Sequence, residues 1–174
     1  MKSAWAAVLL LGLGCIEGPP SGPGKPGKIG RIFGGLDNAD LVAAPERVEA
    51  FRLRPPTTVI DVKPQYNEWP VAGDRVRVPA DVAGRFSRGL TSENTYGGDE
   101  PKDCDPNPGY MLRFHGDGRT VDVVFCFKCA VLFTYRGSRP LWYANFDAST
   151  KAMAALLLKV FPGDPDLARL AEAP

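Results

Sequence analysis

Four cysteines are the residues of this sequence whose chemistry depends most on spacing and surroundings. The stretch "FCFKC" at positions 125–129 places Cys126 and Cys129 three residues apart in the most apolar part of the chain, after Cys104 and far from Cys15. Thiols at this spacing occur in redox motifs, in zinc sites and in structural disulfides. The elements that carry the cysteines must therefore decide among these uses.

Apolar periodicity predicts an α+β fold, an antiparallel sheet meander with helices packed on one face. Alternation of period two predicts strands at 47–54, 57–62, 75–78, 110–114, 120–125, 131–135 and 142–146. Spacings of three and four predict helices that start near Pro79, near Thr150 and at Asp164-Pro165. The turn residues Gly116-Asp117-Gly118 place the tip of a hairpin between two of the strands.

The hairpin brings the domain cysteines together at one end of the sheet. Folding the chain about Asp117 returns Cys126 to the neighbourhood of residue 108, close to Cys104. In a straight strand, Cys126 and Cys129 would lie about 10 Å apart and point to opposite faces, so a turn is expected between them. We expect a structural disulfide from Cys104 to one member of the pair, with redox exchange and soft-metal binding as alternatives.

A zinc site needs four ligands that meet at one point. Cys104, Cys126, Cys129 and the only histidine, His115, have suitable identities. His115 is expected at the hairpin tip as an exposed turn residue, over about 20 Å along the strand from the cysteines. No metal site and no cofactor are therefore predicted.

Other kinds of catalytic or binding chemistry have little support in the sequence. There is no G-x-S-x-G motif, and the acidic residues between Asp99 and Asp105 lack the spacing of a calcium loop. The chain has 21 basic and 20 acidic residues, and scattered charge of this balance argues against nucleic-acid binding. No catalytic residue is proposed.

The N-terminus predicts export. One positive charge is followed by a short apolar run of about ten residues, which is too short to span a bilayer and is typical of a secretory signal. The sequence "LLLGLGC", ending at Cys15, resembles the lipobox of bacterial lipoproteins, although Gly12 stands where leucine is usual. The resemblance covers the first fifteen residues and implies that Cys15 is lipidated, for example with palmitate, and becomes the first residue of the mature chain.

A tether is expected directly after Cys15. The segment "IEGPPSGPGKPGKIG" is rich in glycine and proline, which resist helix and sheet. The expected organisation is a signal peptide at 1–14, a tether at 15–44 and a single domain at 45–174. The lipoprotein resemblance implies a membrane-anchored protein of the bacterial cell envelope, and the absence of aspartate after Cys15 implies the outer membrane. The alternative is a plain secreted protein in which Cys15 has no special role.

Two functional hypotheses follow. The segment from Cys104 to Cys129 loosely resembles uncharacterised exported bacterial proteins with a C-F-x-C stretch, a resemblance that implies no activity. The first hypothesis is a lipid-anchored, non-enzymatic envelope domain that binds an unknown protein or small molecule or has a structural role. The second is a periplasmic redox or metal-handling protein that uses the thiols of Cys104, Cys126 and Cys129.

Overall fold

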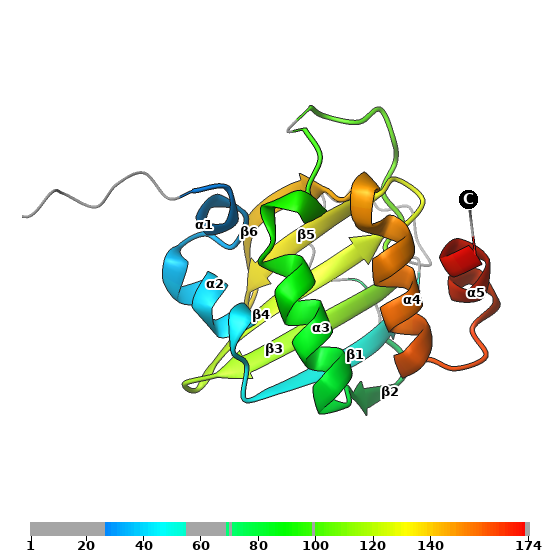
Figure 1. Ribbon diagram of the computed structural model, residues 1–174, viewed down its shortest axis with the longest axis horizontal. Coiled ribbons are helices and arrows are strands. Elements are labelled where there is room, and N and C mark those ends of the chain that lie inside the picture. The colour runs from blue at the N-terminus through cyan, green and yellow to red at the C-terminus, as the bar shows by residue number, and fades with distance from the viewer. Residues whose placement is uncertain (1–26, 55–68, 70, 99, 173–174) are drawn as a thin grey trace, which may run out of the picture.

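A six-stranded antiparallel sheet with helices packed against it forms the body of the protein (Figure 1). This computed structural model describes residues 27–54, 69, 71–98 and 100–172. The strands are β1 (Arg47–Leu53), β2 (Val71–Arg77), β3 (Tyr110–Gly116), β4 (Arg119–Cys126), β5 (Val131–Arg136) and β6 (Arg139–Asn145). The helices are α1 (Lys28–Ile32), α2 (Leu36–Ala43), α3 (Ala80–Leu90), α4 (Thr150–Val160) and α5 (Pro165–Glu172). The predicted α+β class is confirmed.

The sheet has the order β2-β1-β3-β4-β5-β6. Strands β3 to β6 follow one another as a meander, whereas β1 pairs with β3 and leaves β2 at the edge. The register of the central hairpin joins Tyr110 to Phe125 and Gly116 to Arg119. Asp117 (φ 51°) and Gly118 (φ 67°) form its two-residue turn, in the conformation that matches the twist of paired strands. The predicted hairpin is confirmed.

The helices lie over one face of the sheet, and the main core fills the space between them (Figure 1). The stripe predicted for α3 is buried, with Val82 at 4% exposure and Phe86 and Leu90 at 0%. Helices α3 and α4 run side by side, and a Cβ on Gly89 would lie 2.8 Å from the terminal carbon of Met153. A glycine therefore permits the close approach of these two helices.

The folded domain begins earlier than residue 45. Helices α1 and α2 lie within the segment expected to be a tether, and they bury Ile32, Phe33 and Val42 in the main core. Lys28 fixes the start of α1, because its Nζ donates hydrogen bonds to the carbonyl oxygens of Tyr96 (3.1 Å) and Gly97 (2.8 Å). The expected boundary between tether and domain, at residue 45, was therefore wrong, because α1 begins at Lys28.

The opposite face of the sheet carries a second, smaller apolar cluster. Its buried members come from β1, β4, the turn after β4, and β5: Leu53, Val124, Cys126, Cys129, Val131, Phe133 and Tyr135. Trp69 and Met111 pack against them. The strand expected at 57–62 lies outside the described residues, and the strand expected at 75–78 is the longer β2.

His115 is not an exposed turn residue, so that expectation was wrong. It belongs to β3, opposite Thr120 and Arg47 of the neighbouring strands, and its side chain is 14% exposed. Its Nε2 lies 2.9 Å from Glu49 Oε2, and its Nδ1 lies 3.0 Å from an Arg47 guanidinium nitrogen. Burial alone would raise the pKa of Glu49, but the hydrogen bond and charge of His115, followed by Arg75 and Arg47, hold that pKa below its usual value. His115 is thus part of a structural charge network.

Candidate functional site

The "CFKC" stretch forms the turn between β4 and β5. Strand β4 ends at Cys126, and β5 begins at Val131. Ala130 adopts a left-handed conformation (φ 50°), and its carbonyl oxygen accepts a hydrogen bond of 2.9 Å from the Phe146 N–H. This turn reverses the chain, so the two cysteines do not continue along one strand.

A disulfide joins Cys104 to Cys129, with their Cα atoms 5.9 Å apart. Cys126 is a free thiol with 0% exposure in the apolar cluster on the outer face. The Asn107 N–H lies 3.2 Å from Cys126 Sγ. All three domain cysteines thus lie at one end of the sheet, but Cys126 and Cys129 are not a bonded pair. A disulfide of this kind indicates a non-cytoplasmic location.

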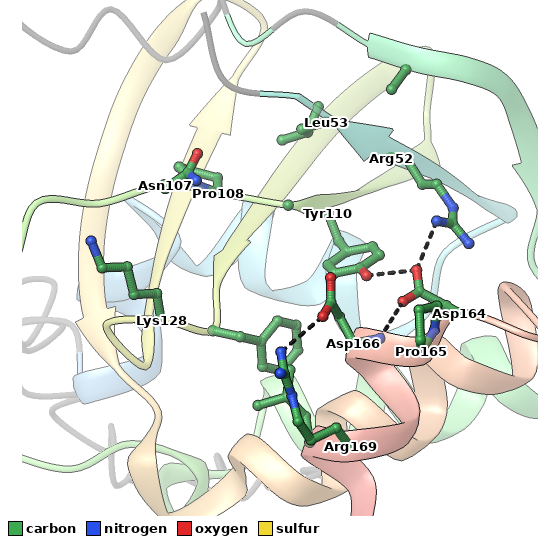
Figure 2. A pocket seen from close by; sticks show the side chains of 14 residues that line it. Arg52, Leu53, Asn107, Pro108, Tyr110, Lys128, Asp164, Pro165, Asp166 and Arg169 are labelled. Carbon is green, nitrogen blue, oxygen red and sulfur yellow. Dashed lines mark hydrogen bonds and ion pairs between the residues drawn. The ribbon is translucent and has the colours of Figure 1, made fainter.

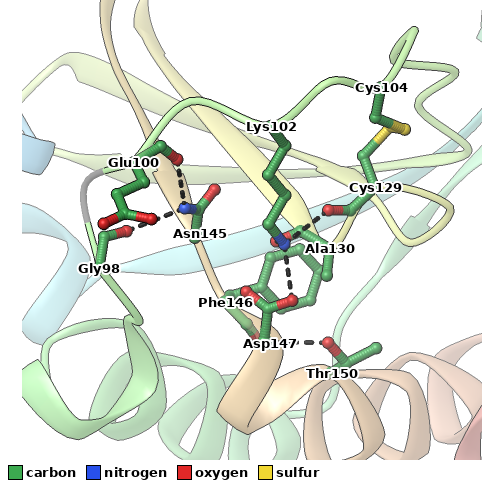
Figure 3. A network of polar contacts seen from close by, with 10 residues as sticks. All are labelled: Gly98, Glu100, Lys102, Cys104, Cys129, Ala130, Asn145, Phe146, Asp147 and Thr150. Carbon is green, nitrogen blue, oxygen red and sulfur yellow. Dashed lines mark hydrogen bonds and ion pairs between the residues drawn. A yellow bond between two sulfur atoms is a disulfide. The ribbon is translucent and has the colours of Figure 1, made fainter.

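The loop that carries Cys104 is attached to the sheet along its length (Figure 3). Asn145 Nδ2 donates to the carbonyl oxygens of Gly98 (2.8 Å) and Glu100 (2.9 Å). Lys102 Nζ donates to the Cys129 carbonyl oxygen (2.8 Å) and pairs with Asp147 Oδ1 (2.6 Å). These contacts and the disulfide fix both the loop and the turn that it crosses.

A cleft of about 790 Å³ opens beside this turn (Figure 2). Phe127 and Lys128 of the turn line it together with the ends of β1 and β3, the start of the loop before β3, and α5. Its lining includes Arg52, Asn107, Pro108, Tyr110, Phe127, Lys128, Asp164, Asp166, Arg169 and Leu170. Volumes of 300–1,000 Å³ are usual for ligand sites, so we take this cleft as the candidate binding site.

A buried polar network forms one wall of the cleft. Asp164 Oδ2 accepts a hydrogen bond of 2.7 Å from the Tyr110 hydroxyl and lies 2.8 Å from an Arg52 guanidinium nitrogen. Asp164 Oδ1 accepts the N–H groups of Asp166 (3.0 Å) and Leu167 (3.1 Å) at the start of α5. One carboxylate therefore joins β1, β3 and α5.

The pKa values in this network follow from its contacts. Burial alone would raise the pKa of Asp164, but the Tyr110 hydroxyl, the Leu167 N–H, the Arg52 charge and the Asp166 N–H together hold it below its usual value. Burial, followed by the hydrogen bond to Asp164 and its negative charge, raises the pKa of Tyr110. Asp164 is thus an ionised structural anchor, and Tyr110 stays protonated as its donor.

Aromatic rings form the floor between the turn and α5. The rings of Tyr110 and Phe127 meet edge to face with centroids 5.9 Å apart, and Phe161 lies 5.8 Å from Tyr110. The Arg52 guanidinium carbon lies 5.1 Å from the Phe161 ring centroid. Because Phe127 also stacks on Phe125 at 6.0 Å, the floor continues into the main core.

The remaining residues singled out from the sequence lie elsewhere. His115 is not brought to the cysteines, and no group of three or more His, Cys, Asp or Glu side chains within the described ranges could hold a metal ion. Cys15 lies outside the described residues. Among the described helices, none has the length and apolar character needed to cross a membrane.

Sequence reasoning missed the cleft. From the sequence, Tyr110 was assigned to an alternating strand and Asp164 to the start of a helix. The structure agrees with both assignments, since Tyr110 belongs to β3 and Asp164 directly precedes α5. The signal that could have raised attention is Asp164-Pro165, because an aspartate before a helical proline is a typical capping residue. The hydrogen bond between Asp164 and Tyr110 joins residues 54 positions apart, and no pattern in a single sequence predicts such a contact.

Comparison with known proteins gave no match to a protein-family model, a curated protein or a solved structure.

Proposed function

We propose that this protein is an exported, lipid-anchored domain of the cell envelope that acts by binding a partner or ligand in the cleft beside the "CFKC" turn. The lipobox-like sequence before Cys15 and the Gly/Pro-rich segment after it support the anchor. The disulfide supports export, because bonds of this kind persist in oxidising compartments.

One observation carries the binding role: the disulfide joins the two segments that form one side of the cleft. Cys129 belongs to the same turn as Phe127 and Lys128, and Cys104 belongs to the loop that continues to Asn107. The Asp164 network fixes the opposite wall, formed by α5 and the residue before it. Walls that are already fixed lose little conformational freedom when a ligand enters, and this favours binding.

Binding is favoured over the thiol-dependent alternative because of the state of the sulfurs. Cys129 is bonded to Cys104 and 5% exposed, and Cys126 is fully buried on the opposite face of the sheet from the core-facing Phe125. Reactive thiols need exposure and an environment that stabilises the thiolate. The arrangement therefore supports a cross-link of structural use rather than a dithiol centre.

The anchor is tested by labelling cells with a palmitate analogue and separating membranes. Wild-type protein should be labelled and sediment with the membranes, and Cys15→Ser should be unlabelled and released while the domain stays folded. Replacement of Cys126 by Ser is the matched control, because its thiol is buried. Unlabelled wild-type protein that is cleaved before Cys15 would refute the anchor.

The binding role is tested in intact cells with a photo-crosslinking side chain at Asn107, in the cleft wall. The same side chain at Lys151, an exposed position of α4 outside the cleft, is the control. We expect a distinct adduct from position 107 that depends on the disulfide. Equal yields at the two positions would contradict a role for the cleft.

A further inference from the structure

The charges that line the cleft are unequally satisfied. Arg52 is paired with Asp164 at 2.8 Å, and Arg169 is paired with Asp166 at 2.8 Å. Lys128 is exposed and lines the same cleft, yet it has no hydrogen bond or ion pair with any residue in the described part of the chain. The cleft therefore presents one positive charge without a counter-charge.

Lys128 stands next to neutral polar groups. Figure 2 shows Lys128 and Asn107 on the same side of the cleft, across from the Asp164 network. The Asn107 side chain has no hydrogen bond within the described residues, and its amide group can donate to an anion. Both carboxylates of the cleft lie in the other wall, at α5 and the residue before it, where each has a cationic partner. An anionic group is thus favoured at the Lys128 side.

Apolar surface adjoins that charge. Phe127 precedes Lys128 in the turn, is only partly buried, and meets the Tyr110 ring at 5.9 Å. Pro108 and Leu170 add apolar lining from two further segments. A ligand that placed a purely charged group in this cleft would leave the aromatic floor uncovered, whereas one with an apolar group beside its charge would cover both.

We propose that the cleft binds a carboxylate attached to an apolar or aromatic group, with Lys128 contacting the carboxylate and Phe127 and Tyr110 contacting the apolar part. The proposal rests on the cleft being the binding site, as argued above. Two sources share this chemistry: the C-terminus of a peptide that ends in an apolar residue, and a free fatty acid. Lys128 acts here as a point charge, which a carboxylate from either source satisfies.

The test is a titration of the folded, oxidised protein observed by backbone amide NMR shifts. The probes are an N-acetylated dipeptide ending in phenylalanine with its C-terminal amide, and octanoate with octanol. The acid of at least one pair should shift resonances of the turn and of α5. The affinity of its uncharged analogue should be lower by a factor of about five or more, since one charge contact is lost. The pair with the tighter acid identifies the source.

Matched variants separate the charge from the fold. Lys128→Gln should weaken binding of the acid about fivefold and leave the uncharged analogue unaffected, whereas Lys151→Gln should change neither. Both positions are exposed, and the NMR spectrum itself reports whether the fold is kept. Added salt should weaken the binding of the acid and leave the binding of the uncharged analogue unchanged.

The outcomes are distinguishable. Equal affinities for acid and uncharged analogue, or an unchanged affinity in Lys128→Gln, would overturn the carboxylate assignment and leave the cleft as a binding site. Shifts that occur away from the cleft, or none with any probe up to its solubility limit, would overturn the carboxylate assignment. Equal crosslinking at positions 107 and 151 would overturn the binding role separately.

Discussion

Removing the cross-link between Cys104 and Cys129 should destabilise the domain without changing its fold. The perturbation is the double variant Cys104→Ser, Cys129→Ser, which leaves no unpaired partner behind. The disulfide joins two positions that are 25 residues apart in the sequence, and the loop it closes contains the whole β3–β4 hairpin. In the chain-entropy relation, closing a loop of this length lowers the entropy of the unfolded chain and so stabilises the folded state by about 3.5 kcal/mol at 25 °C.

The assay is guanidinium unfolding at equilibrium, followed by tryptophan fluorescence, with melting temperature as a second measure. A loss of about 3.5 kcal/mol corresponds to about 7–14 °C in melting temperature for a domain of this size. Reductant should shift the wild type by the same amount and leave the double variant unchanged. Cys126→Ala serves as the control, because its cost comes from lost packing and does not depend on reductant.

The double variant should remain folded because the other attachments do not involve sulfur. Lys102 still donates to the Cys129 backbone carbonyl, and the Gly109 N–H still donates to the Phe125 carbonyl at 3.1 Å. A wild type that unfolds at the same denaturant concentration with and without reductant would refute the reasoning. So would a double variant that loses the sheet altogether.

Three further changes test the packing and the charges. The pKa of Asp164 is lowered in the folded state, so this carboxylate stabilises the fold fully above its ordinary pKa of about 4, and the stabilisation is lost as pH falls through the folded-state pKa. Asp164→Asn should therefore be less stable than the wild type at neutral pH. Its free energy of unfolding, measured by urea titration at stepped pH, should also fall less steeply with acid. Gly34→Ala should cost about 1–3 kcal/mol in urea unfolding, because Gly34 has φ 66° and a Cβ would lie 2.9 Å from Leu141 Cδ2; an unchanged midpoint would contradict this. Asp122→Asn should cost about 1.5–3 kcal/mol by the same assay, because the nearly buried carboxylate accepts two Arg113 hydrogen bonds of 2.7 and 2.8 Å, and equal stability would show the pair to be dispensable.

The elements with clear periodicity were predictable from the sequence. The alternation around Gly116-Asp117-Gly118 predicted the hairpin, but the expected register, with Cys126 opposite residue 108, was one residue away from the observed pairing of Tyr110 with Phe125. The observed register is the one that keeps Leu112 and Phe114 in the core. That register also placed Cys104 near the "CFKC" turn. Alternation did not reveal that β6 is an edge strand, which leaves Trp142 48% exposed.

Helices α1 and α2 were missed for a physical reason. Composition near Gly34 and Gly35 resembles a linker, yet these glycines form a tight turn between two short helices, with φ of 66° and 139°. Helices of five and eight residues have little intrinsic stability, so tertiary contacts of Ile32 and Phe33 must hold them. The cleft was missed for the same reason: contacts between distant segments leave no local pattern.

The cleft lies far from the point where the described chain begins. The described chain begins at α1, which packs beside β6, whereas the cleft lies by β1, β2 and α5 near the opposite edge of the sheet (Figure 1). Only residues 16–26 separate Cys15 from the described domain, a reach of at most about 40 Å. An anchor at Cys15 would therefore join the domain on its β6 side and keep it within about 40 Å of the bilayer, while the cleft lies away from this attachment, where a partner attached to a neighbouring structure could approach it.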